Sequence, residues 1–255
     1  MVRLLDGESV FEPIDTAHTK SLQMSLAEVG ARLSDVFGAD NILWVEGQTE
    51  EVCFTAIIER ILKRRLMGTA VVGIRETGDL ERRDAERVLE IYEKLSTGVA
   101  LIPPAIAFVL DRETRTDAQQ EDIRRRSKNR ARFIPRRTYE NYLLNPMAVS
   151  NVMNQIKGFR ETTVAEDEVY KAIEAKKQEQ KYFSPLRIQD DPNHWISNIH
   201  GAKVLSDLFS ELSETRVAFH KVEHSAKLTD WLIGHCPEDL REIAELLDCV
   251  LSGKP

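Results

Sequence analysis

The apolar residues of this sequence form short uninterrupted runs that alternate with longer amphipathic stretches. Runs of strand length occupy residues 41–45, 70–74, 105–110 and 132–135. Between them, residues 51–66 and 80–95 repeat apolar positions at the spacing of a helix. Strands that alternate with helices pair in parallel, because each crossover passes over a face of the sheet. The pattern therefore predicts an α/β fold, a mostly parallel sheet flanked by helices.

The two ends of the chain follow other patterns. Residues 1–16 predict a short hairpin or an extended segment, and residues 22–37 predict a helix. Residues 147–193 are polar, rich in Glu and Lys and helix-prone, which predicts a solvated helical insertion. In the last part, 194–255, we expect a strand at 216–220 and a helix near 238–251.

Composition excludes several classes of protein. A net charge of -7 over 255 residues, with 30% charged residues, is that of an ordinary soluble protein, so a polyanion would have to be bound locally. Cys53, Cys236 and Cys249 are far apart, which indicates neither a disulfide framework nor a zinc site and fits the cytoplasm. Two prolines interrupt the longest apolar stretch, 99–110, so we expect neither a signal peptide nor a membrane span.

Acidic residues stand at the ends of two predicted strands. Glu46 ends the first strand, and Glu50 falls in the first turn of the next helix after the flexible Gly47. Asp111 and Glu113 follow the 105–110 strand, where side chains two apart in an extended segment face the same way. Carboxylates at the carboxyl ends of parallel strands converge on one edge, and they suit one or two Mg²⁺ or Mn²⁺ ions. Such ions activate water and stabilise the leaving oxygen of a phosphodiester.

Each acid also has a structural interpretation. A Glu in a first helical turn complements the helix dipole, and an Asp at a strand end is a common turn residue. The coincidence of all four behind two apolar strands favours the metal site.

These residues also carry a resemblance to a known family. The string 42–50, ILWVEGQTE, resembles the first motif of the Toprim domain, and 108–113, FVLDRE, resembles its second, which is usually DxD. The string 137–144, RTYENYLL, resembles a stretch of Toprim nucleases of the overcoming-lysogenization-defect (OLD) type, which carry an ABC-type ATPase ahead of the Toprim part or work with one as a split partner in phage defence. Glu113 departs from the usual second Asp, and Glu50 stands where many relatives have Asp.

The resemblance implies a division of the chain and a function. Residues 38–146 would form the Toprim core, 1–37 the end of an ATPase domain, 147–193 the insertion, and 194–255 a part that completes the Toprim lobe. The resemblance implies a cytoplasmic, metal-dependent endonuclease that cuts DNA or RNA. Its regulator would be an ABC-type ATPase, in trans or fused, and the resemblance is also compatible with a homo-oligomer. The alternative is a non-catalytic docking module for that ATPase, and a primase or topoisomerase fragment would need further domains that the sequence does not show. The chain has no GxxxxGK[ST] string with which to bind ATP itself.

A cation is expected near the developing charge of the phosphodiester. In these nucleases a late lysine serves, and Lys203 is the first candidate, with Lys221 second; either could equally be a solvated lysine. A basic run after the second acidic motif predicts contacts to a phosphate backbone, with a plain solvated face as the alternative. Its members are Arg124, Arg125, Arg126, Lys128, Arg130, Arg136 and Arg137.

Other polar and aromatic residues receive structural interpretations. Glu140 and Asn141 could orient a substrate, but a polar pair before an apolar run could equally satisfy backbone groups, so we assign them no catalytic role. Tyr139, Tyr142 and Trp195 are expected in the core or an interface rather than stacked on bases. The histidines show no metal spacing, and of these only His200 is a weak candidate for the site.

Overall fold

The centre of the molecule is a parallel sheet of four strands. The structure, a computed structural model, describes residues 2–5, 8–11, 39–73, 105–184 and 194–253. Within them the strand order is β4-β3-β5-β6, and every neighbouring pair is parallel. The strands are β3 (Asn41–Val45), β4 (Thr69–Gly73), β5 (Ala105–Leu110) and β6 (Ala131–Phe133). The predicted α/β class and parallel sheet are confirmed.

The two central strands are buried almost throughout. In β3, Ile42 to Val45 are all buried, and in β5 every residue is buried except Ile106, which is partly buried. Leu43 pairs with Val71 of β4 on one side and with Ala107 of β5 on the other. Strands covered on both faces read as continuous apolar runs, which is why sequence predicted these two with their observed bounds.

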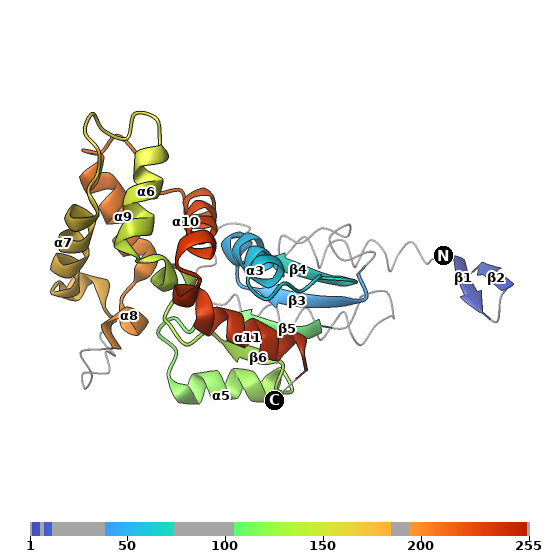
Figure 1. The fold of residues 1–255 in the computed structure, drawn as a ribbon. Helices are drawn as coiled ribbons and strands as arrows, with labels where there is room; N and C mark the ends of the chain where they lie inside the picture. Colours follow the sequence, from blue (N-terminus) through green and yellow to red (C-terminus); the bar gives the residue numbers. More distant parts are fainter. Residues whose placement is uncertain (1, 6–7, 12–38, 74–104, 185–193, 254–255) are drawn as a thin grey trace.

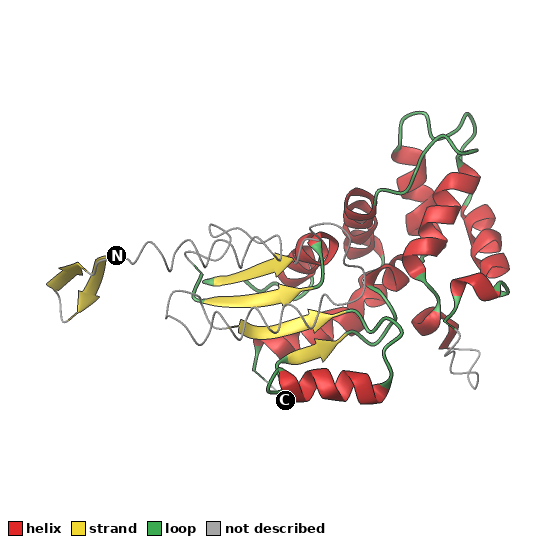
Figure 2. Ribbon diagram, turned by 180° about the vertical axis from the view of Figure 1, so that it is seen from behind, coloured by secondary structure: helices red, strands yellow, loops and turns green. Residues whose placement is uncertain are grey.

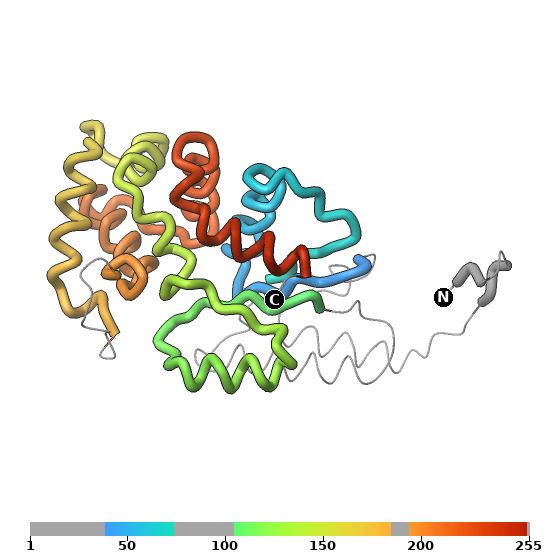
Figure 3. Tube along the Cα trace, turned by 60° about the horizontal axis from the view of Figure 1, so that its bottom comes forward, coloured from blue at the N-terminus to red at the C-terminus, as the bar shows by residue number. Residues whose placement is uncertain are grey.

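Helices cover the sheet. The helix α3 (Gln48–Arg60) contacts β3 and β4, α11 (Arg241–Leu251) contacts β5 and α3, and α5 (Asp117–Arg126) contacts β6 (Figure 1). The helix α10 (Lys221–His235) packs along α3, as the tube in Figure 3 also shows. The predicted helix 51–66 ends earlier, since Ile61 is its C-cap and Lys63 takes a left-handed conformation with φ 52°.

A second, helical lobe faces the carboxyl ends of the strands, toward which all four arrowheads point in Figure 2. The apolar side chains of this lobe form one hydrophobic core with those of β3, α3 and α10. Each of its longer helices therefore buries one face in that core. The lobe consists of η1 (Tyr139–Leu143), α6 (Pro146–Gln155), α7 (Glu166–Lys177), η2 (Gln180–Tyr182), α8 (Trp195–Asn198) and α9 (Gly201–Leu212).

The predicted strand at 216–220 is wrong. Glu214 and Thr215 have φ of 55° and 64°, which turns the chain sharply before this segment. Val217 and Phe219 pack onto the hydrophobic core, and residues 217–220 are irregular. The alternating apolar side chains of this segment therefore cover the hydrophobic core, and its backbone does not pair with a neighbouring strand.

The ends of the chain follow the remaining predictions in part. Val2–Leu5 (β1) and Glu8–Phe11 (β2) pair as an antiparallel hairpin, as expected. The predicted C-terminal helix begins as a 3-10 turn, η4 (Pro237–Leu240), and continues as α11. The helices expected at 22–37 and 80–95 lie outside the described residues. Among the described helices, none has the length and apolar character needed to cross a membrane.

Candidate functional site

The turn after β3 holds Glu46 against the end of β5. Glu46 Oε2 accepts a hydrogen bond from the backbone N–H of Asp111 at 2.6 Å, so the two strand ends are joined through this carboxylate. Gly73 of β4 passes close beneath, since a Cβ there would lie 2.5 Å from Gly47 O. Burial raises the pKa of Glu46 to about 7; Arg115 opposes this, whereas Glu50 adds to it.

Glu50 points inward from the first turn of α3. Only 2% of the residue is exposed, and its Oε1 is buried without a hydrogen-bond partner among the described residues. Burial raises the pKa of Glu50, Lys221 lowers it, and the neighbouring carboxylate of Glu140 raises it further. A first-turn Glu that only complements the helix dipole would remain in solvent, so Glu50 fits the site interpretation better.

Asp111 completes the group at the end of β5. It is 5% exposed, and its Oδ1 is buried without a hydrogen-bond partner among the described residues. Burial holds the pKa of Asp111 well above its usual range, followed by repulsion from Glu46 and Glu50. Carboxylates that raise one another's pKa lie in one electrostatic cluster.

Glu140 is a member of this cluster that the sequence interpretation missed. It is 0% exposed in η1, and neither carboxylate oxygen has a hydrogen bond among the described residues. Its Oε1 forms an ion pair with Lys221 Nζ at 3.2 Å. The available signal was an acid between apolar aromatic residues, Tyr139 and Tyr142, in a segment that is buried throughout. We name Glu46, Glu50, Asp111 and Glu140 the acidic cluster.

Of the two interpretations of the neighbouring Asn141, the one in which it satisfies backbone groups is confirmed. Its amide Nδ2 donates to Ile196 O at 2.5 Å and to Ile199 O at 2.8 Å. Its Oδ1 accepts from Thr138 Oγ1 at 2.9 Å and from Gly201 N at 3.2 Å. Asn141 thus fastens η1 to α8, to the residue that follows α8 and to the start of α9, and it fixes the position of Glu140.

Of the two candidate lysines, Lys221 lies at the cluster. Burial lowers its pKa, but the charges of Glu140, Glu50 and Asp111 outweigh burial and raise it. The side chain remains 51% exposed, so the ammonium reaches the acids from solvent. Lys203 Nζ instead lies 5.8 Å above the ring of Tyr182.

Glu113 diverges from Asp111, contrary to the expectation for an extended segment. The strand ends at Leu110, and Glu113 takes a left-handed conformation with φ 50°. Its carboxylate is 38% exposed and forms an ion pair with Arg137 Nε at 3.8 Å. Glu113 nevertheless contributes to the raised pKa of Glu46, so it borders the acidic cluster without joining its interior.

The basic run is divided by the fold. The part up to Arg130 lies in the last turn of α5 and in the turn that precedes β6, whereas Arg136 and Arg137 follow β6, on the side of the acids. The arginines at the end of α5 pair with acids of their own helix, as in the contacts of Arg125 and Arg126 with Asp122. The run is therefore not one continuous surface.

Arg136 and the aromatic candidates have structural contacts. Arg136 lies 4.0 Å above the ring of Tyr142 and pairs with Glu242 at 3.1 Å. Tyr139 and Tyr142 are core residues, as expected, and the Tyr139 hydroxyl shares a 2.7 Å hydrogen bond with Thr229. His200 is partly buried, and burial lowers its pKa.

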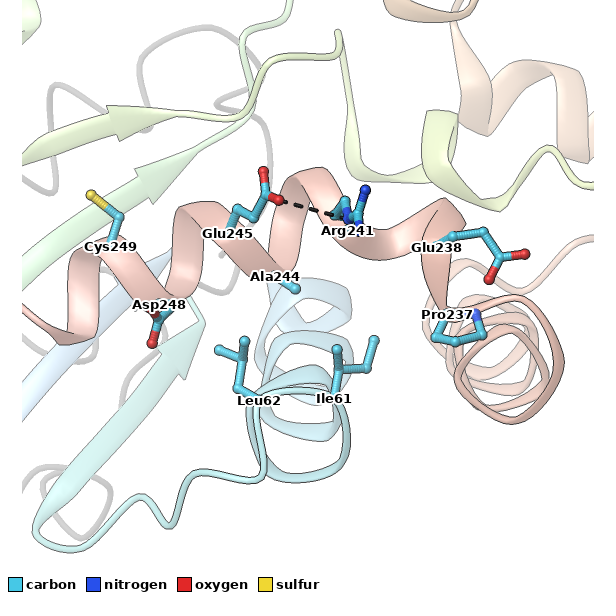
Figure 4. A pocket seen from close by; sticks show the side chains of 9 residues that line it. All are labelled: Ile61, Leu62, Pro237, Glu238, Arg241, Ala244, Glu245, Asp248 and Cys249. Carbon is cyan, nitrogen blue, oxygen red and sulfur yellow. Dashed lines mark ion pairs between the residues drawn. The ribbon is translucent and has the colours of Figure 1, made fainter.

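A cavity of about 570 Å³ lies away from these residues, between the end of α3 and α11 (Figure 4). Glu50 and Ile61 are separated by eleven residues of α3 and its C-cap, about 16 Å at 1.5 Å per residue. The cavity is therefore a separate surface. It is lined by Ile61, Leu62, Pro237, Glu238, Arg241, Ala244, Glu245, Asp248 and Cys249.

The acidic cluster has the donor chemistry of a hard-cation site. Its carboxylates include buried oxygens without hydrogen bonds, which is costly unless a cation or a proton compensates them. Among the described residues, no three acidic, histidine or cysteine side chains are close enough together to form a ready-made metal site. Binding a metal would therefore require these carboxylates to change rotamer.

Comparison with known proteins adds no relative. No family model matches the sequence, and no curated protein or solved structure is detectably similar to the chain.

Proposed function

We propose that this protein is a metal-dependent nuclease that hydrolyses phosphodiester bonds of DNA or RNA. The observation that supports the proposal most is the acidic cluster, in which Glu50, Asp111 and Glu140 present buried carboxylate oxygens without hydrogen bonds. Buried polar groups are hydrogen-bonded as a rule, and clusters of buried acids that perturb one another's pKa are typical of functional sites. Their place at the carboxyl ends of parallel strands is where α/β proteins bind ligands.

The chain's own residues have distinct parts in this proposal. Glu46, Glu50, Asp111 and Glu140 would hold one or two Mg²⁺ or Mn²⁺ ions, with Glu113 at the border. Bound there, the metal would supply an activated water and stabilise the charge on the phosphate. Lys221, paired with Glu140 at 3.2 Å, is the candidate to counter the negative charge that develops in the transition state.

The Toprim resemblance carries the rest of the proposal. An OLD-type nuclease works with an ABC-type ATPase, so we infer such a partner and a role in antiviral defence in the cytoplasm. The alternative is a docking module without catalysis. The cavity between α3 and α11 favours it, because that apolar surface with a charged rim is separate from the acids.

The deciding experiment is a cleavage assay on supercoiled plasmid and on total tRNA. Wild type, Glu46→Ala and Asp111→Ala are each incubated with Mg²⁺, Mn²⁺ or EDTA. Glu51→Gln is the matched control, since Glu51 lies on the same helix but accepts a hydrogen bond from Gly73 N at 3.0 Å. Metal-dependent cutting that both alanine variants lose and the control retains would support the nuclease. Absence of cutting, with an ATPase partner also present, would favour the docking module.

A further inference from the structure

Two arginines beside the acidic cluster converge on one backbone carbonyl. Arg112 Nη2 donates to Ser197 O at 2.6 Å and to Asn198 Oδ1 at 2.8 Å. The backbone N–H of Arg137 donates to the same Ser197 O at 2.9 Å. The guanidinium of Arg137 is held in turn by Tyr182 O, 3.5 Å from Nη1. Contacts from α8 and η2 thus fix both arginines in place.

The charges of this pair are incompletely compensated. The Nε atoms of Arg112 and Arg137 are both buried and have no hydrogen-bond partner among the described residues. The side chain of Arg137 is only 11% exposed, and its ion pair with Glu113, at 3.8 Å, is longer than a hydrogen bond. Burial lowers the pKa of both arginines; Asp117 opposes this for Arg112 and Glu113 for Arg137, whereas Arg112 lowers the pKa of Arg137 further. The two guanidinium groups therefore repel each other, and an anion between them would be stabilising.

We propose that Arg112 and Arg137 form a clamp for a phosphate of the nucleic-acid backbone. Arg112 follows Asp111 directly in sequence. Glu113, which pairs with Arg137, also raises the pKa of Glu46. A phosphate held there would lie next to the acidic cluster, as a strand entering the active site requires. Guanidinium groups suit this role because their planar donors match phosphate oxygens. The identity of the anion rests on the proposed function.

The arginines of α5 differ from this pair in a way that provides a control. Arg125 is 79% exposed and pairs with Asp122 three residues away on the same helix. Its partner moves with it, so it carries little uncompensated charge. We therefore expect Arg125 to contribute little to binding, although sequence places it in the basic run.

The test measures binding in EDTA, where no metal-dependent cleavage can occur. Fluorescence anisotropy follows a labelled 20-nucleotide single strand, and the matching duplex, with wild type, Arg112→Gln, Arg137→Gln and Arg125→Gln. For the single strand, each clamp substitution is expected to weaken binding about tenfold, the effect of one lost charge-assisted hydrogen bond. Each should also reduce the slope of log affinity against log salt by about 0.7. Wild-type affinity and slope in both clamp variants would overturn the clamp.

A folding control separates loss of the clamp from loss of structure. Arg112→Lys and Arg137→Lys keep the charge but not the planar donors, so they should restore the salt slope while leaving affinity below wild type. Circular dichroism checks that each variant melts like wild type. Should a Gln variant unfold, the Lys variants decide, since wild-type affinity in both would refute the clamp.

The outcomes also distinguish the clamp from the nuclease. If wild type binds through the two arginines but cuts nothing, the clamp stands and the nuclease proposal falls. If wild type cuts and the clamp variants cut with unchanged KM at every salt concentration, the nuclease stands and the clamp falls.

Discussion

Replacing Glu46 by Gln should stabilise the metal-free protein while abolishing its response to metal. The Gln amide oxygen can still accept the 2.6 Å hydrogen bond from Asp111 N, so the junction between β3 and β5 is kept. What the substitution removes is a charge, and burial together with Glu50 and Glu113 makes that charge unfavourable.

The magnitude follows from the pKa of Glu46. In the folded protein it is raised from 4.5 to about 7, so between these values the native state binds more protons than the unfolded state. Stability therefore falls as pH rises through this range, and above pH 7 the full cost of ionisation is present. At about 1.4 kcal/mol for each tenfold change in proton affinity, the rise from 4.5 to about 7 corresponds to a cost of at most about 3.5 kcal/mol. Glu46→Gln should recover it at pH 8 and recover nothing at pH 4.

Urea unfolding followed by circular dichroism tests this in EDTA at pH 4, 6 and 8, and again at pH 8 with Mg²⁺. Wild type should gain stability from Mg²⁺ and the variant should not, because ligand binding to the native state alone stabilises it. Glu51→Gln is the control, expected to show no gain that depends on pH. A Glu46→Gln protein that is less stable than wild type in EDTA at pH 8 would refute the electrostatic reasoning.

Three further substitutions probe the surroundings of the cluster. Lys221→Met should abolish cleavage and lower the free energy of unfolding at pH 8 by about 1–3 kcal/mol, because it leaves buried carboxylates uncompensated. Lys203→Met should do neither. If both variants changed cleavage and stability equally, the assignment of Lys221 to the cluster would be contradicted. Asn141→Ala should lose at least about 3 kcal/mol in urea unfolding, since it removes donors and acceptors on four backbone groups; a loss below 1 kcal/mol would contradict the role of Asn141 as a fastener. Gly73→Ala would place a Cβ 2.5 Å from a backbone oxygen of the turn after β3, so we expect a loss of about 1–3 kcal/mol by the same measurement and weaker cleavage, and wild-type values would show that the turn can shift freely.

The strands were predictable because burial on both faces leaves a continuous apolar run. For 41–45 and 105–110 the observed bounds are those predicted, and the edge strands β4 and β6 differ by one or two residues at their ends. The segment 216–220 has the same alternation as a strand, and only its tertiary neighbours show that it is irregular. Local pattern cannot tell a sheet partner from a helical surface.

The site was predictable where it depends on strand ends and not where it depends on helix packing. Glu46 and Asp111 follow apolar runs, so the edge on which they meet was implied by a parallel sheet. Glu140 meets Lys221 because α10 packs against both η1 and α3. Such a contact joins distant parts of the chain and leaves no periodic signal. Glu113 was misplaced because nothing in its sequence context indicates a left-handed residue after β5.

The distribution of charge explains how a protein of net charge -7 could bind a polyanion at an acidic edge. The acidic cluster alone would repel a phosphate, and Lys221 compensates it only in part. Arg112 and Arg137 lie on the segments that immediately follow β5 and β6, so they bring positive charge to the same edge of the sheet. A metal ion would remove the remaining repulsion from within. Under this proposal the two sources of positive charge have different roles. The arginines bind the phosphates of the strand, and the metal, when bound, neutralises the acidic cluster so that it no longer repels the strand.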